Sequence, residues 1–290
     1  MSFKSFGKDK LGASLRTLIR PRNSVVGIDW KLLYQYRDLL GLWIRRDIVS
    51  KYRQTVLGPL WFIFQPLVTA LVFVVIFSKG LKLSTDGVPA PLFYLTGLVV
   101  WNYVSQCLNS TSMTLVANSG LFKKVFFPRL ILPFSYCLSS LVSMGIQSGV
   151  LAICYFYFVV QGADTRPDIL VLLLPVLLVQ LVLLSFGLGL WISALSVKYR
   201  DFHHVWSLIA PLWLYATPVS YPLSAIPSDW QWIIKLNPLT IIIEGFRLGI
   251  LGVGTFTPSD WLPSVLFTLI ISISGTMLFQ TVERTCVDSL

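Results

Sequence analysis

Long apolar runs separated by short basic loops constrain the fold of this chain more than any other feature. Six runs without Lys, Arg, Asp or Glu cover residues 60–78, 92–117, 130–160, 169–197, 204–221 and 261–281. A helix needs about 20 apolar residues to cross the hydrocarbon of a bilayer. Hydrophobic residues make up 55% of the chain and charged residues 12%, which exceeds the apolar content of an ordinary water-soluble domain. The sequence therefore predicts an all-α integral membrane protein with six transmembrane helices.

Basic residues predict the orientation of these helices. They flank the cytoplasmic side of the first, third and fifth runs: Arg45, Arg46, Lys51, Arg53, Lys123, Lys124, Arg129, Lys198 and Arg200. Short loops rich in Lys and Arg stay in the cytoplasm, so we expect both termini there. The opposite loops are less basic, although Lys79 and Lys82 reduce the contrast.

The formal net charge of +10 does not require a nucleic-acid partner. The first 56 residues hold twelve Lys or Arg against four Asp, and attraction to the anionic inner leaflet explains this excess. The first 20 residues lack an apolar core with a small-residue cleavage site, so we expect no secretory signal peptide. Residues 1–28 are expected to form a cytoplasmic tail.

Residues 29–56 are expected to form an amphipathic helix before the first span. Apolar residues recur at three- and four-residue steps on one side: Trp30, Leu33, Leu40, Ile44 and Ile48. Such a helix can lie on the cytoplasmic membrane surface with its apolar face in the lipid boundary. A solvated helix packed on the rest of the protein is the alternative.

The loop at residues 118–129 carries aromatic and basic side chains together. Asn118 or Ser119 can cap a short helix there, and Pro128 ends it. Phenylalanines exposed on a cytoplasmic loop are costly unless they enter a partner's groove or the membrane interface. Both interpretations stay open from the residues alone.

The segment at residues 222–257 is predicted to form a re-entrant hairpin on the outer side, before the last span. Prolines divide it into two pieces, 224–236 and 239–249, and each is too short to cross the bilayer. Irregular backbone at membrane depth is tolerated only where it is buried in protein or lines water. We therefore expect the hairpin to border a conduit through the membrane. Glu244 and Arg247 stand three residues apart and can form an ion pair, which is either structural or part of a gate or headgroup contact.

No constellation for catalysis or metal binding is visible in the sequence. It lacks HExxH, GxSxG and clustered His, Cys or carboxylates, and its four cysteines form no CxxC pair, so we expect neither a metal site nor a disulfide framework. The phosphate-binding loop GxxxxGK[ST] is also missing. Any ATP and Mg²⁺ must therefore be bound by another subunit.

The spans carry aromatic and amide side chains in place of charges. The amides of the second span are Asn102, Gln106 and Asn109. Aromatic rings stack on sugar rings and amides bond hydroxyls, so this lining would suit a saccharide. The aromatic residues expected to line a channel are Trp61, Phe64, Tyr94, Trp101, Tyr103, Trp206, Trp213 and Tyr215. Membrane-interface anchoring is the alternative for each of them.

Several motifs occur in an order that resembles a known family. They are Arg46-Asp47-Ile48, Lys51-Tyr52-Arg53, Thr55-Val56-Leu57-Gly58-Pro59-Leu60-Trp61, Pro66-Leu67, Phe126-Phe127-Pro128-Arg129, Val197-Lys198-Tyr199-Arg200-Asp201, Asn237-Pro238-Leu239-Thr240 and Glu244-Gly245-Phe246-Arg247. Together they resemble the transmembrane subunits of type-2 ABC exporters, which move cell-surface polysaccharides such as O-antigen, capsule and teichoic acid. The resemblance spans residues 46–247.

The resemblance implies a homodimer in the bacterial inner (plasma) membrane that exports a lipid-linked glycan with two cytoplasmic ATPase subunits. Residues implied to contact the ATPase are Arg45, Arg46, Arg53, Leu121, Phe122, Lys123, Lys124, Phe126, Phe127 and Arg129. Residues implied at an outer gate are Tyr221, Pro222, Asn237, Pro238, Glu244 and Arg247. A type-2 exporter of drugs or lipids, and an ATP-independent channel or carrier, remain alternatives.

Overall fold

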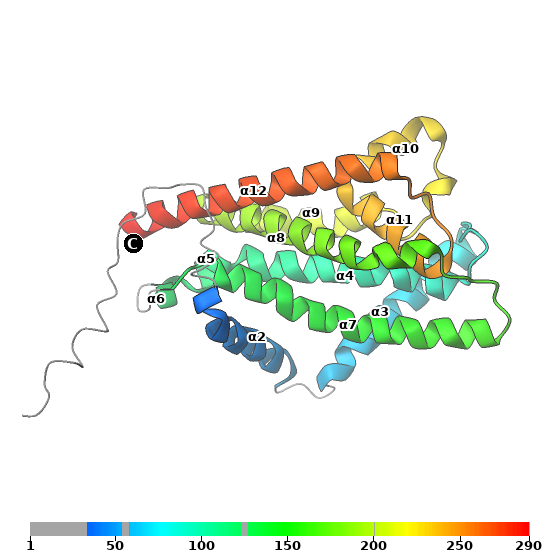
Figure 1. The fold of residues 1–290 in the computed structure, drawn as a ribbon, viewed down its shortest axis with the longest axis horizontal. Helices are drawn as coiled ribbons and strands as arrows, with labels where there is room; N and C mark the ends of the chain where they lie inside the picture. Colours follow the sequence, from blue (N-terminus) through cyan, green and yellow to red (C-terminus); the bar gives the residue numbers. More distant parts are fainter. Residues whose placement is uncertain (1–33, 54–57, 123–126, 200, 290) are drawn as a thin grey trace, which may run out of the picture.

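The described part of the chain is built from helices, without a strand. The structure is a computed structural model that describes residues 34–53, 58–122, 127–199 and 201–289 (Figure 1). The elements are α2 (Arg37–Tyr52), η1 (Gly58–Leu60), α3 (Trp61–Phe73), the π-helix η2 (Val74–Gly80), α4 (Ala90–Ser112), α5 (Thr114–Ala117), α6 (Ser119–Phe122), α7 (Ile131–Val160), η3 (Ile169–Leu173), α8 (Leu174–Lys198), α9 (Phe202–Ala216), η4 (Leu223–Ala225), α10 (Ser228–Lys235), α11 (Pro238–Leu251) and α12 (Pro258–Ser289). The predicted all-α class is confirmed for these residues.

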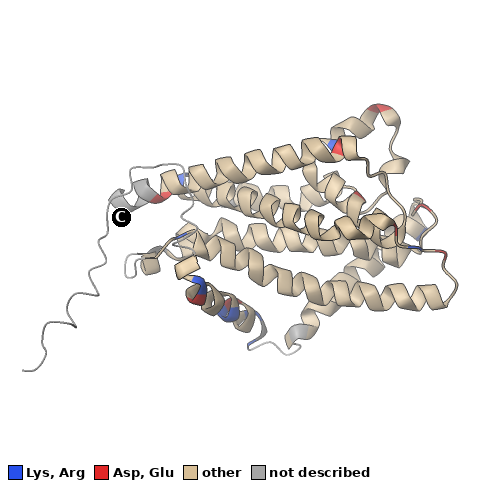
Figure 2. Ribbon diagram, in the orientation of Figure 1, with Lys and Arg blue, Asp and Glu red and all other residues tan. Residues whose placement is uncertain are grey.

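The long helices form a bundle that is elongated along their common direction. Helix α4 packs against α7 and α8, and α12 packs along α8. Helices α2 and α6 lie at one end of the bundle with the end of α12, whereas α10 and α11 lie toward the other (Figure 1). Charged residues gather at these two ends and leave the long helices uncharged between them (Figure 2). This distribution suits a molecule whose middle lies in hydrocarbon.

Four helical segments of the described residues are long and apolar enough to cross a membrane. They cover Trp61–Gly80, Ile131–Val160, Ile169–Lys198 and Pro258–Glu283. These match the first, third, fourth and sixth predicted spans to within a few residues. The second and fifth predicted spans correspond to α4 and α9. These two helices do not meet the requirement of both length and apolar composition.

Helix α4 is the most deeply buried long helix of the bundle. Sixteen of its 23 residues are buried, and it contacts α3, α7, α8, α9 and α11. Its buried residues are mostly apolar, as expected for a helix that other helices cover. The predicted run of residues 92–117 is not continuous, because α4 ends at Ser112 and the short α5 follows Met113.

Helix α9 is shorter than the predicted span of residues 204–221. It ends at Ala216, because Thr217 has extended backbone angles (φ −104°, ψ 142°). Thr217 precedes Pro218, whose ring disfavours helical angles in the residue before it. The extended segment after α9 brings the Val219 carbonyl to the ion pair described below.

Helices α8 and α12 approach so closely that their contact requires glycine. A Cβ atom on Gly275 would lie 2.4 Å from the carbonyl oxygen of Gly187, and a Cβ on Gly187 would lie 2.6 Å from the Ser272 Cα. Gln180 ties the same two helices together by donating to the Ser264 hydroxyl at 2.8 Å and accepting from the Trp261 indole at 2.9 Å. The glycines and the hydrogen-bonded Gln180 amide thus join α8 to α12 along much of their length.

Candidate functional site

The Glu244–Arg247 ion pair lies on α11, a helix with defined ends. Asn237 caps its start by accepting a hydrogen bond from the Leu239 N–H at 3.1 Å, and Pro238 occupies its first turn. Gly252 ends it in the left-handed conformation (φ 75°). The sequence therefore determines both ends of α11, because Asn and Pro are favoured at a helix start and Gly after a helix end.

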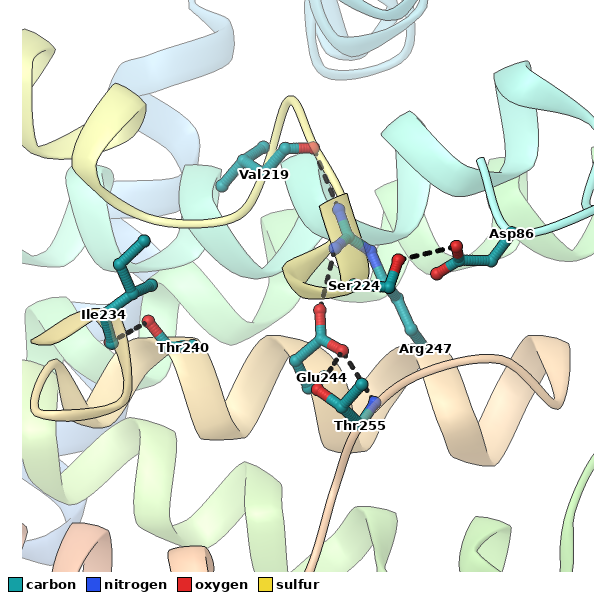
Figure 3. A network of polar contacts seen from close by, with 8 residues as sticks. All are labelled: Asp86, Val219, Ser224, Ile234, Thr240, Glu244, Arg247 and Thr255. Atoms are coloured by element: carbon teal, nitrogen blue, oxygen red, sulfur yellow. Dashed lines mark hydrogen bonds and ion pairs between the residues drawn. The ribbon is translucent and has the colours of Figure 1, made fainter. Parts of the chain in front are cut away.

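The ion pair is almost fully enclosed by protein. Arg247 Nη1 lies 3.1 Å from Glu244 Oε1, and the two side chains are 1% and 3% exposed. Arg247 Nη2 donates to the Val219 carbonyl at 2.9 Å, and its guanidinium lies 3.7 Å from the centre of the Phe93 ring. Glu244 Oε2 accepts from the Thr255 N–H at 2.9 Å (Figure 3). The predicted pairing is therefore present as a buried pair.

This pair connects four segments of the chain. It links α11 to the chain after α9, to α4 and to the loop before α12. Helix α4 can approach because it carries Gly97, where a Cβ would lie only 3.1 Å from Arg247 Nη2. Within the described residues, Arg247 Nε and the Tyr94 hydroxyl have no hydrogen-bond partner.

The other predicted outer-gate residues lie at the start of α11 and in the segment that follows α9. Asn237 Nδ2 donates to the Thr217 hydroxyl at 2.9 Å, and the Pro238 carbonyl accepts from Ser264 at 3.1 Å. Tyr221 donates to the Tyr215 carbonyl at 3.2 Å, and Pro222 is buried. Close by, Ser224 donates to Asp86 at 2.7 Å (Figure 3). Asp86 and Phe93 were not predicted at this site, because nothing in the local sequence pattern pairs them with α11.

The predicted channel aromatics divide into two groups. Tyr94, Trp101, Tyr103 and Trp206 are buried and Trp213 is half-buried, whereas Trp61, Phe64 and Tyr215 are exposed. Ring contacts bring Trp101 and Trp206 to Trp213, with centroids 5.9 and 6.2 Å away. The structure therefore places these three tryptophans together, between α4 and α9. Tyr94 instead packs on Phe73 of α3.

The predicted ATPase-contact residues that the structure describes lie around the end of the bundle that holds α2, α6 and the start of α7. Phe127 is buried there, with its ring centroid 6.4 Å from Trp43 and 5.8 Å from Phe122. Since Phe127 packs on α2 and α7 of its own chain, its ring is not available to a partner's groove. Lys123, Lys124 and Phe126 lie outside the described residues.

Helix α2 packs on α7. Leu40 and Trp43 join the cluster around Phe127, while Asp47 pairs with Lys51 at 2.8 Å and accepts a hydrogen bond from Ser139. The helix begins at Arg37, and residues 29–33 lie outside the described part of the chain.

Several cations remain on the surface at this end of the bundle. Arg45, Arg46 and Arg53 are exposed, and the Arg46 guanidinium lies over the Trp43 ring at 3.7 Å. Arg129 is turned inward, 3.5 Å from Glu283 of α12. Leu121 and Phe122 of α6 are half-buried. The exposed arginines of α2 thus give this end of the bundle a basic surface for a partner.

The fold and these sites define the class of the protein, an all-helical membrane protein with a buried polar cluster at one end of its bundle and a basic surface at the other. The sequence matches the ABC-2 type transporter family over residues 39–251, from α2 to the end of α11. The chain belongs to this family, and the resemblance drawn from its motifs is confirmed.

Three polysaccharide export or transport proteins are similar in sequence to most of this chain. An O-antigen export system permease protein RfbA of Myxococcus xanthus is 31% identical over 74% of this chain and 81% of its own length. Another RfbA, from Klebsiella pneumoniae, is 30% identical over 72% of this chain and 79% of its own length. The polysialic acid transport protein KpsM of Escherichia coli is 23% identical over 84% of this chain and 93% of its own length.

Proposed function

We propose that this chain is the permease subunit of an ATP-driven exporter that moves a lipid-linked polysaccharide, similar to O-antigen, out of the cytoplasm across the inner (plasma) membrane. The observation that carries the proposal is the similarity to two O-antigen export permeases, at 30% and 31% identity over nearly three quarters of the chain. Permeases for capsule polysaccharide and polysialic acid are also similar. An exporter of drugs or lipids receives no such support.

In this proposal the chain crosses the membrane six times, with both termini in the cytoplasm. The spans are α3 with η2, α4, α7, η3 with α8, α9, and α12. The basic surface of α2 supports a cytoplasmic position for that end of the bundle. Helix α11 has 14 residues, about 21 Å at 1.5 Å per residue, so together with α10 it enters the outer half and returns.

The energy is supplied by two ATPase subunits that bind ATP and Mg²⁺, and two copies of the permease enclose the path. The missing phosphate-binding loop supports this division of labour. The ATPases contact α6, the segment that follows it and the exposed arginines of α2. Their movement reaches the spans through the cluster around Phe127, because this cluster joins α2 and α6 to the start of α7.

The test is purification of the tagged chain from its native membrane in mild detergent, followed by mass spectrometry and an ATPase assay. We expect a nucleotide-binding subunit in roughly equal amount, and loss of surface polysaccharide when the gene is deleted. Recovery of this chain alone, with unchanged surface polysaccharide in the deletion strain, would overturn the proposal.

A charge-reversal pair tests the ATPase contact separately. Arg45→Glu should reduce recovery of the ATPase, because Arg45 is exposed on α2. Arg166→Glu is the matched control, since Arg166 is also exposed but lies in the loop before η3, which is proposed to be outside the cell. Equal ATPase recovery with both variants would remove α2 from the contact without removing the transport function.

A further inference from the structure

The part of α4 that no other helix of the chain covers is polar. After the first turn, the residues of α4 that are not buried are Asn102, Ser105, Gln106, Asn109 and Ser110. Their spacing of three, one, three and one places them on one face of the helix. We call these five residues the polar face of α4.

This face differs from the exposed surfaces of the other long helices. Leu71 of α3, Leu212 of α9 and Ile270 of α12 are 63%, 68% and 64% exposed, as expected for side chains that meet lipid. Amides and hydroxyls that meet hydrocarbon without partners are strongly unfavourable. The polar face of α4 therefore meets water or a polar ligand in the membrane.

Neighbouring helices fix the edges of the polar face. Asn102 donates to Gln147 of α7 at 3.1 Å, and Asn109 accepts from the Trp206 indole of α9 at 3.3 Å. Asn109 also lies 3.5 Å from the Ser105 hydroxyl, to which its Nδ2 donates. Between them, Gln106 makes no side-chain hydrogen bond within the described part of the chain, so its amide can both donate and accept.

We propose that the polar face of α4 binds the hydroxyl groups of an uncharged saccharide chain as it passes through the membrane. This inference rests on the proposed function and deepens it. A sugar hydroxyl donates and accepts, and an amide offers both roles at once. No charged side chain belongs to the face, which makes it a poor site for phosphate or carboxylate groups.

Water accessibility is the first test. Asn109→Cys should react in membranes with a charged, water-soluble thiol reagent, because its side chain is exposed on the polar face. Thr111→Cys, which is buried, and Ile270→Cys, which is exposed on an apolar helix, should not react. The unchanged chain gives the background from its own cysteines. An Asn109→Cys chain that resists the reagent would overturn the inference, because a second copy or lipid would then cover the face.

Loss of hydroxyl binding is the second test. Gln106→Leu keeps a similar volume and removes the amide, and it should lower surface polysaccharide by about two- to tenfold per recovered complex, the equivalent of one hydrogen bond. Gln161→Leu is the matched control, since Gln161 is an exposed amide at the end of α7. If Gln106→Leu does not accumulate, Gln106→Glu replaces it, and the added charge should lower export further.

The two proposals fail in different ways. If gene deletion leaves surface polysaccharide unchanged, the proposed function is wrong, whatever the thiol reagent shows. If deletion abolishes surface polysaccharide and both Gln106→Leu and Gln161→Leu export at the normal level, only the role of the polar face of α4 is wrong.

Discussion

Replacing Arg247 should destabilise the protein far more than replacing an exposed basic residue. In Arg247→Met the carboxylate of Glu244 stays 3% exposed and loses its counter-charge, while the Val219 carbonyl loses its donor. Removing one partner of a buried ion pair costs about 3–5 kcal/mol, because a buried charge is left uncompensated. The hydrogen bond from the Thr255 N–H to Glu244 remains and keeps the loss at the lower end of this range.

The assay is the thermal midpoint of the purified chain in detergent. At roughly 2–4 °C per kcal/mol, the loss corresponds to a midpoint lowered by roughly 6–20 °C. Lys235→Met is the matched control: it breaks the Lys235–Asp260 pair, whose side chains are 26% and 25% exposed. Partly exposed pairs contribute about 0–1 kcal/mol, so its midpoint should change by roughly 0–4 °C.

A double-mutant cycle separates the pair from its surroundings. Glu244→Gln alone leaves the Arg247 cation buried without a counter-charge, so it should also be strongly destabilising. The double variant Glu244→Gln/Arg247→Met buries no charge and should recover about 1–3 kcal/mol relative to the sum of the single changes. Additive effects of the two single changes would refute the reasoning. So would an Arg247→Met midpoint within roughly 2 °C of the unchanged chain, which is about the measurement error.

Three further changes test the packing of the bundle. Phe127→Ala should cost about 3–5 kcal/mol and expose α2 to proteases, which limited proteolysis measures. Gly275→Ala should lower the yield of folded protein in detergent chromatography, because a Cβ there meets backbone, whereas Gly145→Ala, with no atom within 4 Å of its Cβ, should be neutral or stabilising by about 1 kcal/mol. Gln180→Leu should lower the thermal midpoint, since it leaves the Trp261 indole without its acceptor, at about 1–3 kcal/mol.

The sequence predicted the elements of this fold better than their contacts. The run at residues 130–160 corresponds to α7 over Ile131–Val160, because 30 mostly apolar residues without a charge allow little else. The pairing of Glu244 with Arg247 was also predictable, since three-residue spacing on a helix brings their side chains together. The end of α9 at Ala216 depended on the proline at position 218, a signal that the apolar run concealed.

The orientation of the aromatic residues was not predictable from the sequence. Tyr94, Trp101 and Tyr103 lie on α4, in which residues 92–101 are buried without a break, so the sequence does not reveal which neighbour covers each ring. The packing of α7, α8 and α11 against α4 determines it. The same packing leaves Gln106 and Asn109 at the surface, and it encloses Phe93 against Arg247.

Polar side chains in this bundle are of two kinds: those with a hydrogen-bond partner in another segment and those without one among the described residues. Arg247 and Gln180 are buried and bonded to other segments, so their replacement should lower stability before it changes transport. Gln106 is only half-buried and has no such bond within the described residues, so its replacement should change transport while the fold persists. Hydropathy gives Gln180 and Gln106 the same unfavourable value, because it depends on the residue type and not on the hydrogen-bond partner. The contrast between Arg247→Met and Gln106→Leu, measured as thermal midpoint against export, therefore tests whether the uncovered polar face belongs to the path.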